Sequence, residues 1–225
     1  MPVERIFDEA DVNELLEQNS APPYGARNAA LILGGVYWGL TPLEQSLVAT
    51  EDVMAPNGEF YRVWVLPAHN SYNGEAREIH TEDHVLPFFE KYAEFRVSES
   101  WMPSNLNTHR GFAHDKPFFL NDQGQPYRVT ERKGTAGKYQ PRSMNEKLKS
   151  MVAKTNLYGA TPASFRDSFV KGMHDNGCGW SDLKKVTGIK QKRTLEKKVR
   201  PHERELKAVM KNLFSRVKMP EKLNK

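Results

Sequence analysis

Apolar residues recur every three or four positions along most of this chain, which is the spacing of one face of an α-helix. This periodicity predicts helices over residues 7–16, 27–37, 42–48, 81–92, 143–157, 161–176, 180–188 and 203–217. Residues 60–66 have the two-residue period of a strand instead, and the Asn73-Gly74 turn signal leads to a second short strand over 76–80. The expected fold is therefore mainly α with a small antiparallel β-sheet, an α+β arrangement.

The starts of several helices carry capping signals. The spacing Ser/Thr-x-x-Glu predicts capping boxes at residues 41–44 and 143–146, and Thr161 followed by Pro162 predicts a further helix start. Ser181 is a candidate cap for the helix over 180–188. The pair Gly34-Gly35 lies inside an apolar helix, where each glycine costs about 1 kcal/mol relative to alanine. Close packing against another element would explain this pair.

The domain organisation follows from the same pattern. No stretch has the composition of a linker, so residues 1–225 are predicted to form a single domain. Within it we expect a short buried strand over 118–120 and a mobile, polar loop over 122–138. The last amphipathic stretch belongs to a C-terminal helix and tail over 203–225. That helix has two alternatives, docking on a neighbouring molecule or packing on its own core.

Composition favours an ordinary globular protein of a reducing compartment. Of the 225 residues, 38% are hydrophobic and 27% are charged, which is enough apolar material for a real core. The single cysteine, Cys178, cannot form an internal disulfide. No apolar run reaches the length of a membrane span, and the N-terminus lacks the apolar core of a signal peptide. We therefore expect a cytoplasmic protein with no membrane partner.

Positive charge is concentrated in the C-terminal part of the chain. Residues 161–225 contain 17 Lys and Arg against 7 Asp and Glu, whereas residues 1–160 contain 16 against 21. Eight cations fall within 17 positions, opposed only by Glu196: Lys184, Lys185, Lys190, Lys192, Arg193, Lys197, Lys198 and Arg200. Such a cluster predicts a polyanionic partner, and double-stranded DNA is the expected one. The alternative is a solvated basic surface with no partner.

Arg166 is a further candidate for phosphate binding. It lies in the first turns of the helix over 161–176, where the helix dipole disfavours a cation. A bound anion would account for an arginine there, because backbone N–H groups and a guanidinium together bind phosphate well. The alternative is a surface arginine that pairs with Asp167 or Asp175.

The remaining candidate residues give little support for a metal site or for catalysis. His80 and His84 have the spacing of a helical metal pair, but His80 is expected to end a strand, so we predict no metal site and no cofactor. His109 and His114 are expected to be solvated in a loop. No base is evident near Cys178, which argues against a nucleophilic role. Three of the four tryptophans are expected in the core rather than as platforms for bases: Trp38, Trp64 and Trp101.

The order of these elements resembles the catalytic domain of the tyrosine recombinase, or phage integrase, family. The acidic helix and the Arg-x-x-Ala-Leu stretch at the start of that domain are similar to residues 12–33. The segment Trp38-Gly39-Leu40-Thr41-Pro42-Leu43-Glu44 resembles the family's Thr-Gly-Leu-Arg-x-x-Glu motif, and residues 118–121 match a Phe-Phe-Leu-Asn segment. Residues 161–169 resemble the motif Thr-Pro-His-x-Leu-Arg-His-x-Phe. The resemblance covers nearly the whole chain.

Most of the catalytic residues that the resemblance implies are replaced in this chain. Only the second arginine is retained, as Arg166. The family's other positions fall on the following residues: the first arginine on Thr41, the two histidines on Ala163 and Asp167, the hairpin lysine near residues 69–71, and the later His or Trp on Ile189. The nucleophilic tyrosine should lie near residues 197–199, yet no tyrosine follows Tyr158. We therefore assign no catalytic residue in this chain.

These replacements predict a recombinase-like protein without recombinase chemistry. The family attacks a DNA phosphodiester with tyrosine, and each preorganised donor to the transition state contributes about 3–4 kcal/mol. Loss of several donors and of the nucleophile should leave no useful turnover. We also expect the family's N-terminal core-binding domain to be absent from this sequence, and therefore no two-domain clamp around DNA from this chain alone.

Three functional hypotheses follow. The first is a catalytically inactive DNA-binding protein that acts as a regulator or accessory factor of a mobile element, associated with the nucleoid. The second is a divergent recombinase whose nucleophile is Thr194, Tyr158 or a tyrosine donated by a partner. The third is a protein-interaction module that joins a recombination assembly, by self-association or through a recombinase partner, with residues 203–225.

Overall fold

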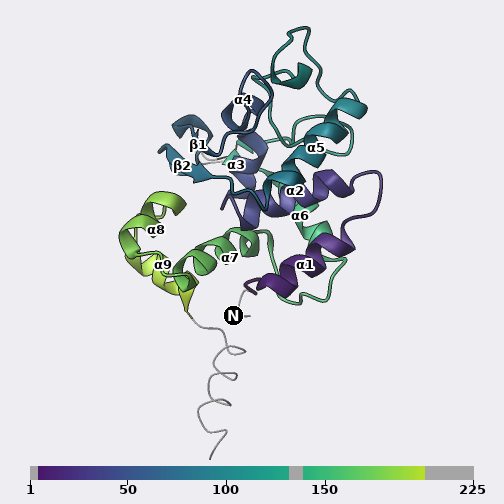
Figure 1. Ribbon diagram of the computed structural model, residues 1–225. Helices are drawn as coiled ribbons and strands as arrows, with labels where there is room; N and C mark the ends of the chain where they lie inside the picture. The colour runs from purple at the N-terminus through teal and green to yellow at the C-terminus, as the bar shows by residue number, and fades with distance from the viewer. Residues whose placement is uncertain (1–4, 132–138, 201–225) are drawn as a thin grey trace, which may run out of the picture.

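A computed structural model describes residues 5–131 and 139–200 of the chain (Figure 1). The longer helices are α1 (Glu9–Gln18), α2 (Gly25–Val36), α5 (Leu86–Ser98), α6 (Arg142–Val152) and α7 (Pro162–Asp175). The shorter ones are α3 (Pro42–Leu47), α4 (Thr50–Val53), α8 (Trp180–Thr187) and α9 (Lys192–Val199), with 3-10 turns η1 (Ala68–Asn70) and η2 (His109–Gly111). Two antiparallel strand pairs are present, β1 (Val63–Leu66) with β2 (Arg77–His80) and β3 (Thr130–Glu131) with β4 (Tyr139–Gln140). The predicted fold class is confirmed.

Helix α2 is the centre of the core. Nearly every residue of its second half is buried, and it packs against both α5 and α7. Just beyond its end, the indole of Trp38 stacks on the ring of Phe89 with 3.8 Å between centroids, and Trp64 meets it edge-on at 5.1 Å. The expected burial of Trp38 and Trp64 is confirmed, and Trp101 is partly buried.

The Gly34-Gly35 pair allows this close approach. A methyl group at Gly34 would lie 2.9 Å from the ring of Phe119, and one at Gly35 would lie 2.7 Å from Cβ of Phe165 on α7. Both separations are shorter than a normal carbon–carbon contact. The predicted reason for the two glycines, contact with another element, is therefore confirmed.

Replacing Gly35 with alanine is expected to destabilise the protein by about 1–3 kcal/mol, because the added methyl group overpacks the contact between α2 and α7. The higher helix propensity of alanine opposes this by only about 1 kcal/mol. Gly172→Ala in α7 is the matched control, since a methyl group there meets nothing within 4 Å, and this variant should be unchanged or more stable. Urea denaturation of both variants measures the difference, and equal stability of the two would contradict the packing argument.

Several helix boundaries differ from the prediction. Helix α6 begins at Arg142 after Pro141, so Ser143 is not its cap, and its hydroxyl donates instead to the carbonyl of Arg128 at 3.3 Å. Helix α8 begins after Gly179 rather than after Ser181. Helix α5 begins at Leu86, several residues later than expected. These segments use tertiary contacts or backbone geometry where the sequence offered a side-chain cap.

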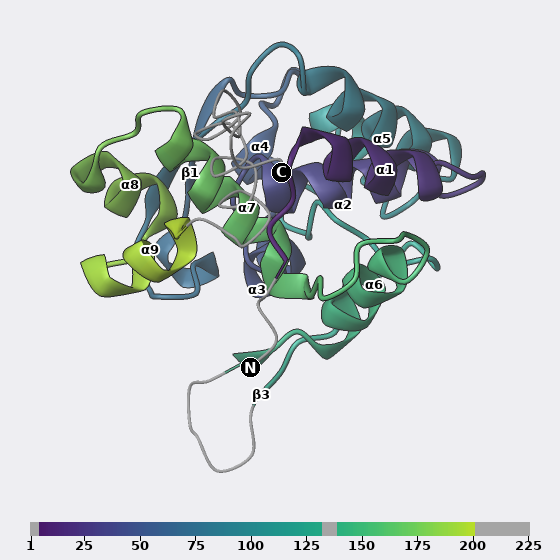
Figure 2. The same cartoon turned by 90° about the horizontal axis from the view of Figure 1, so that it is seen from below.

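The β1–β2 pair has the two-faced pattern that was expected. Trp64 and Leu66 point inward, and Val63 and Val65 are exposed. The segment over 118–120 is fully buried but does not form a strand, because Leu120 makes only an isolated bridge to Pro126. Figure 2 shows β3 at an edge of the molecule, away from α8 and α9. Residues 132–138 of the expected mobile loop and the predicted helix over 203–217 lie outside the described residues.

The long connection between α5 and residue 118 is more ordered than its polarity suggests. His109 is buried, its backbone N–H donates to the carbonyl of Pro56 at 3.0 Å, and its ring stacks on His114 with 5.4 Å between centroids. The expectation that His109 is solvated is wrong. Burial, with the neighbouring His114, lowers the pKa of His109.

Helices α7, α8 and α9 form a corner at one side of the molecule, beside β1 and β2 (Figure 1). A separate small apolar cluster holds this corner together, made of Val170, Leu183, Ile189, Leu195 and Val199. Gly188 ends α8 in the left-handed conformation, with φ +69°, as its position in the sequence predicted. No helix within the described ranges is both long and apolar enough to cross a membrane.

Candidate nucleic-acid interface

Thr41 serves as a helix cap. Its hydroxyl accepts a hydrogen bond from the N–H of Glu44 at 3.2 Å, and its own N–H donates to Oε2 of Glu44 at 2.7 Å. The capping box predicted from the sequence is confirmed. A threonine committed to this cap offers no guanidinium to a phosphate.

Glu44 also forms a buried ion pair that sequence reasoning missed. Nη2 of Arg77 donates to Oε2 of Glu44 at 2.8 Å, and both side chains are almost fully buried. Burial alone would raise the pKa of Glu44, but the hydrogen bonds and charge of Arg77, with the charge of Arg166, hold that pKa below its usual range. One signal was present: Arg77 occupies the same inward register of β2 as Ile79.

Arg166 is buried rather than exposed. It is 9% exposed, its Nη2 donates to the carbonyl of Thr187 at the end of α8, and its guanidinium lies 4.2 Å from the centre of the Tyr72 ring. Neither expected surface pairing occurs: Asp167 pairs with Lys198 of α9, and Asp175 pairs with Lys171 at 2.6 Å. That alternative is therefore wrong.

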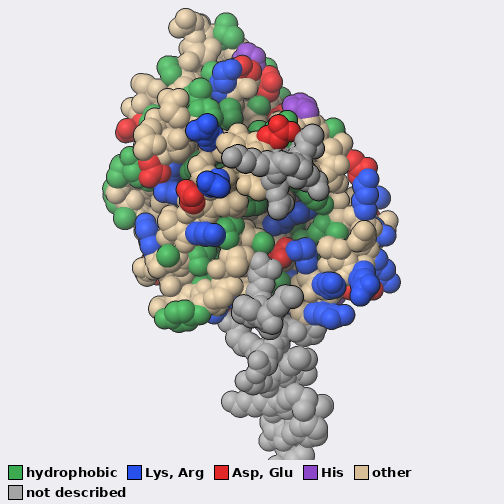
Figure 3. All heavy atoms as spheres, turned by 180° about the vertical axis from the view of Figure 1, so that it is seen from behind, with side chains coloured by type: hydrophobic (Ala, Val, Ile, Leu, Met, Phe, Trp, Pro, Cys, Tyr) green, Lys and Arg blue, Asp and Glu red, His purple; other side chains and the backbone are tan. Residues whose placement is uncertain are grey.

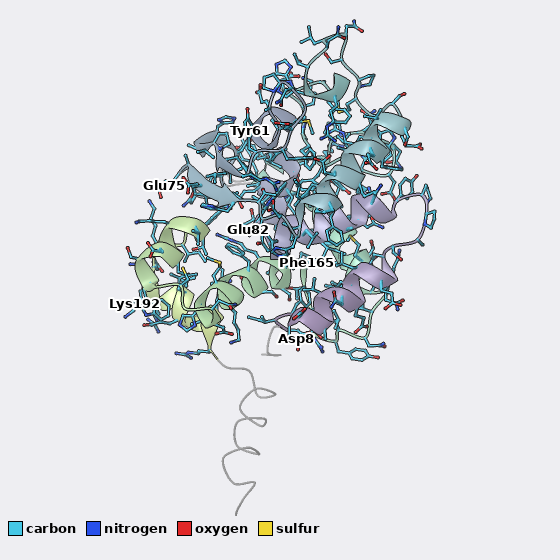
Figure 4. The ribbon with its side chains drawn as sticks, in the orientation of Figure 1. Asp8, Tyr61, Glu75, Glu82, Phe165 and Lys192 are labelled. Carbon is cyan, nitrogen blue, oxygen red and sulfur yellow. The ribbon has the colours of Figure 1, made fainter. Side chains whose placement is uncertain are left out.

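The connection between β1 and β2 lies against the end of α8. The hydroxyl of Tyr72 and Nδ2 of Asn73 both donate to the carbonyl of Gly188, each at 2.9 Å. Glu75, labelled in Figure 4 just above α8, pairs with Lys190 at 2.6 Å. These contacts place Tyr72 over Arg166 and close that side of the corner.

The cations of the basic segment lie on α8, on α9 and between them, and Figure 3 shows Lys and Arg side chains gathered over this corner. Seven of the eight are exposed: Lys184, Lys185, Lys190, Lys192, Arg193, Lys197 and Arg200. Lys198 is half-buried because it pairs with Asp167 and ties α9 to α7. Its role in this structure is to hold the corner together.

The exposed cations differ in what surrounds them. Lys185 lies 3.4 Å from Asp182, and Lys192 lies 3.7 Å from Glu196. Lys190 pairs with Glu75. The remaining four exposed cations form no ion pair with a carboxylate among residues 5–131 and 139–200: Lys184, Arg193, Lys197 and Arg200. A groove of about 490 Å³ between β2 and the end of α8 is lined by Lys184, Lys185 and Lys190 together with Glu75 and Glu78.

Arg166 and the basic segment are neighbours, but they do not share one exposed face. The guanidinium lies beneath Thr187, while the lysines beside Gly188 reach the groove. The structure thus places Arg166 inside the corner and the exposed cations of the basic segment on its outer side.

The candidate nucleophiles lie in separate places. Tyr158 is 83% exposed in the connection between α6 and α7, and Thr194 is half-buried at the start of α9. Ile189 is buried in the corner cluster. Burial and the charge of Asp182 raise the pKa of the Cys178 thiol, which makes it a poorer nucleophile.

His80 ends β2, as predicted, and pairs with Glu78 at 2.8 Å rather than sharing a helix with His84. Within the described ranges, no group of three His, Cys, Asp or Glu side chains is arranged to hold a metal ion.

No protein-family model and no curated protein matches this chain. Solved structures do match it. XerA recombinase has a TM-score of 0.67 at 14% identity, over 97% of this chain and 68% of that one. The Tn1549 transposon integrase in complex with a circular intermediate DNA has a TM-score of 0.56 at 17% identity, over 94% of this chain and 67% of that one. XerH site-specific recombinase bound to difH substrate has a TM-score of 0.58 at 13% identity, over 92% of this chain and 53% of that one. This chain therefore has the fold of a tyrosine-recombinase catalytic domain.

Proposed function

We propose that this protein is a catalytically inactive, recombinase-like protein that binds double-stranded DNA and acts as a regulator or accessory factor of a mobile element. The observation that carries the DNA-binding part is the corner of α8 and α9, with its group of exposed cations. Phosphate contacts from Lys and Arg dominate nonspecific affinity for DNA. Solved neighbours of the same fold include complexes with DNA, which supports this choice of polyanion.

The loss of catalysis rests on the replaced residues. Thr41 is used as a cap, Ile189 is buried in an apolar cluster, and residues 197–199 contain no tyrosine. Arg166, the one retained arginine, already has a carbonyl and an aromatic ring as partners. A pentavalent phosphate would find few of the donors that stabilise it.

A gel shift with a duplex of about 30 base pairs tests DNA binding. We expect binding whose affinity falls steeply with salt, with a slope of log affinity against log salt of about −0.9 for each phosphate contacted. The proposed contacts are the seven exposed cations of the basic segment, together with Arg166 beneath it, whereas Lys198 is paired with Asp167. Binding that does not respond to salt, or no binding in low salt, would rule out the proposal.

The absence of catalysis has its own test, which also addresses the divergent recombinase. A nicked duplex traps a tyrosine recombinase as a covalent protein–DNA adduct, because the broken strand cannot be resealed. We expect no adduct from this protein in denaturing gels. An adduct that disappears in Tyr158→Phe or Thr194→Ala would identify the nucleophile and make the protein an enzyme.

The partner proteins and the extent of the domain stay predictions. A single domain over 1–225, association with the nucleoid, and docking through residues 203–225 are all proposed from the sequence. Size-exclusion chromatography with and without residues 203–225 tests the docking. Loss of a larger species on truncation, with DNA binding unchanged, would favour the interaction module.

A further inference from the structure

Three side chains of the β1–β2 connection, Tyr72, Asn73 and Glu75, form a clasp on the corner of α8 and α9. The clasp holds the carbonyl of Gly188 with two hydrogen bonds of 2.9 Å, and it holds Lys190 with an ion pair of 2.6 Å. The ring of Tyr72 covers Arg166 at 4.2 Å. Figure 4 shows Glu75 on the β2 side of this junction, beside α8.

Two of these contacts occupy groups that would otherwise face a phosphate. The carboxylate of Glu75 takes the position on Lys190 that a phosphate oxygen would take, with the same sign of charge. The ring of Tyr72 presents its electron-rich face to Arg166 and shields it from solvent. The clasp therefore satisfies two cations of the proposed DNA-binding surface from within the chain.

The side chains that form the clasp are at least partly exposed. The side chains of Lys190 and Glu75 are 68% and 53% exposed, and Tyr72 is 38% exposed. Exposed ion pairs contribute little to stability, so a stronger anion can displace one of them. A DNA backbone supplies several phosphates at fixed spacing, which a single carboxylate does not match.

We propose that the clasp is an autoinhibitory contact, which DNA phosphates displace when they bind Lys190 and reach Arg166. This rests on the proposed function, because it regulates the same surface. The closed form then binds DNA through the exposed cations alone, and opening adds the two cations that the clasp covers.

Glu75→Gln is the decisive variant, because it keeps the size of the side chain and removes its competing charge. We expect the affinity for a 30-base-pair duplex at 0.1 M salt to rise roughly five- to ten-fold, because a phosphate no longer has to displace a carboxylate from Lys190. Glu99→Gln is the matched control. It removes one exposed acid at the end of α5, and its affinity should rise much less than that of Glu75→Gln.

A double-mutant cycle assigns the gain to Lys190. In the unmodified chain, Lys190→Gln should change the affinity less than two-fold, because Glu75 already occupies the lysine. In the Glu75→Gln background the same change should abolish the gain. Hydrogen exchange provides a second measurement, and amides of residues 72–76 should exchange faster when the duplex is bound.

The outcomes separate the two proposals. If the unmodified protein binds DNA in a salt-dependent way and Glu75→Gln behaves like Glu99→Gln, the autoinhibitory role of the clasp is wrong and the proposed function stands. Slower exchange of residues 72–76 on binding would overturn the clasp in the same way. If neither protein binds the duplex, the proposed function fails and the clasp fails with it.

Discussion

Arg77→Met is expected to lower the free energy of unfolding by about 3–5 kcal/mol. The substitution leaves the carboxylate of Glu44 buried without its ion-pair partner, and breaking a buried pair from one side costs this much. Urea denaturation followed by circular dichroism at pH 7 measures the loss. The effect should be large because Glu44 also caps α3, which packs against the core.

The matched control is Arg62→Met, just before β1. Arg62 pairs with Asp83 at 2.8 Å, but both side chains are more than half exposed, so the loss should be within about 1 kcal/mol. Removing both charges in the variant Glu44→Gln with Arg77→Met should recover part of the stability lost in Arg77→Met, because the carboxylate of Glu44 is then no longer buried without its ion-pair partner. Equal losses in Arg77→Met and Arg62→Met would show that the buried pair does not stabilise the fold.

The same pair predicts part of the acid sensitivity. The pKa of Glu44 is lower in the folded protein than its usual value of 4.5, so the unfolded chain binds this proton more readily. The contribution of Glu44 is therefore complete above about pH 4.5 and is lost as the pH falls through the folded pKa. The double variant should lose less stability than the unmodified protein between neutral pH and pH 3.

Neutralising four exposed cations of the corner is expected to weaken duplex binding by about 100-fold or more at 0.1 M salt. The variant replaces Lys184, Arg193, Lys197 and Arg200 with glutamine. Each lost phosphate contact reduces the salt slope by about 0.9, so the slope should fall by roughly 2–4. All four side chains are exposed, so the folded structure should be unchanged.

A control variant carries the same change in net charge at other exposed sites. It replaces Lys91, Lys116, Lys149 and Lys154 with glutamine. Titration of both variants with the 30-base-pair duplex by fluorescence anisotropy separates a local effect from a general one. Comparable losses in the two variants would mean that overall charge, and not the corner of α8 and α9, governs binding.

Local chemistry explains why much of the fold was predictable. The capping box of Thr41 and Glu44 and the stop at Gly188 depend on residues within a few positions of one another. The two-residue period of β1 likewise placed Trp64 and Leu66 inside. Each of these features follows from backbone hydrogen bonding or from side-chain direction, which short segments already determine.

The site itself was only partly predictable. The exposed cations of α8 and α9 followed from their number in the sequence, because so many charges on two short helices cannot all be buried. The burial of Arg166 did not follow, since it depends on Thr187 and Tyr72, which are 21 and 94 positions away in the chain. Nor did the burial of His109, which the backbone of Pro56 helps to fix.

Local patterns along the chain were enough to predict the helical character of this protein, the small sheet and the positive charge of its C-terminal part. Which charges remain exposed became clear only from the folded arrangement. Glu44 with Arg77, Glu75 with Lys190, and Asp167 with Lys198 are pairs between distant segments. The physical reason is that a charge acts over a few ångströms of space, and only folding determines which side chains come that close.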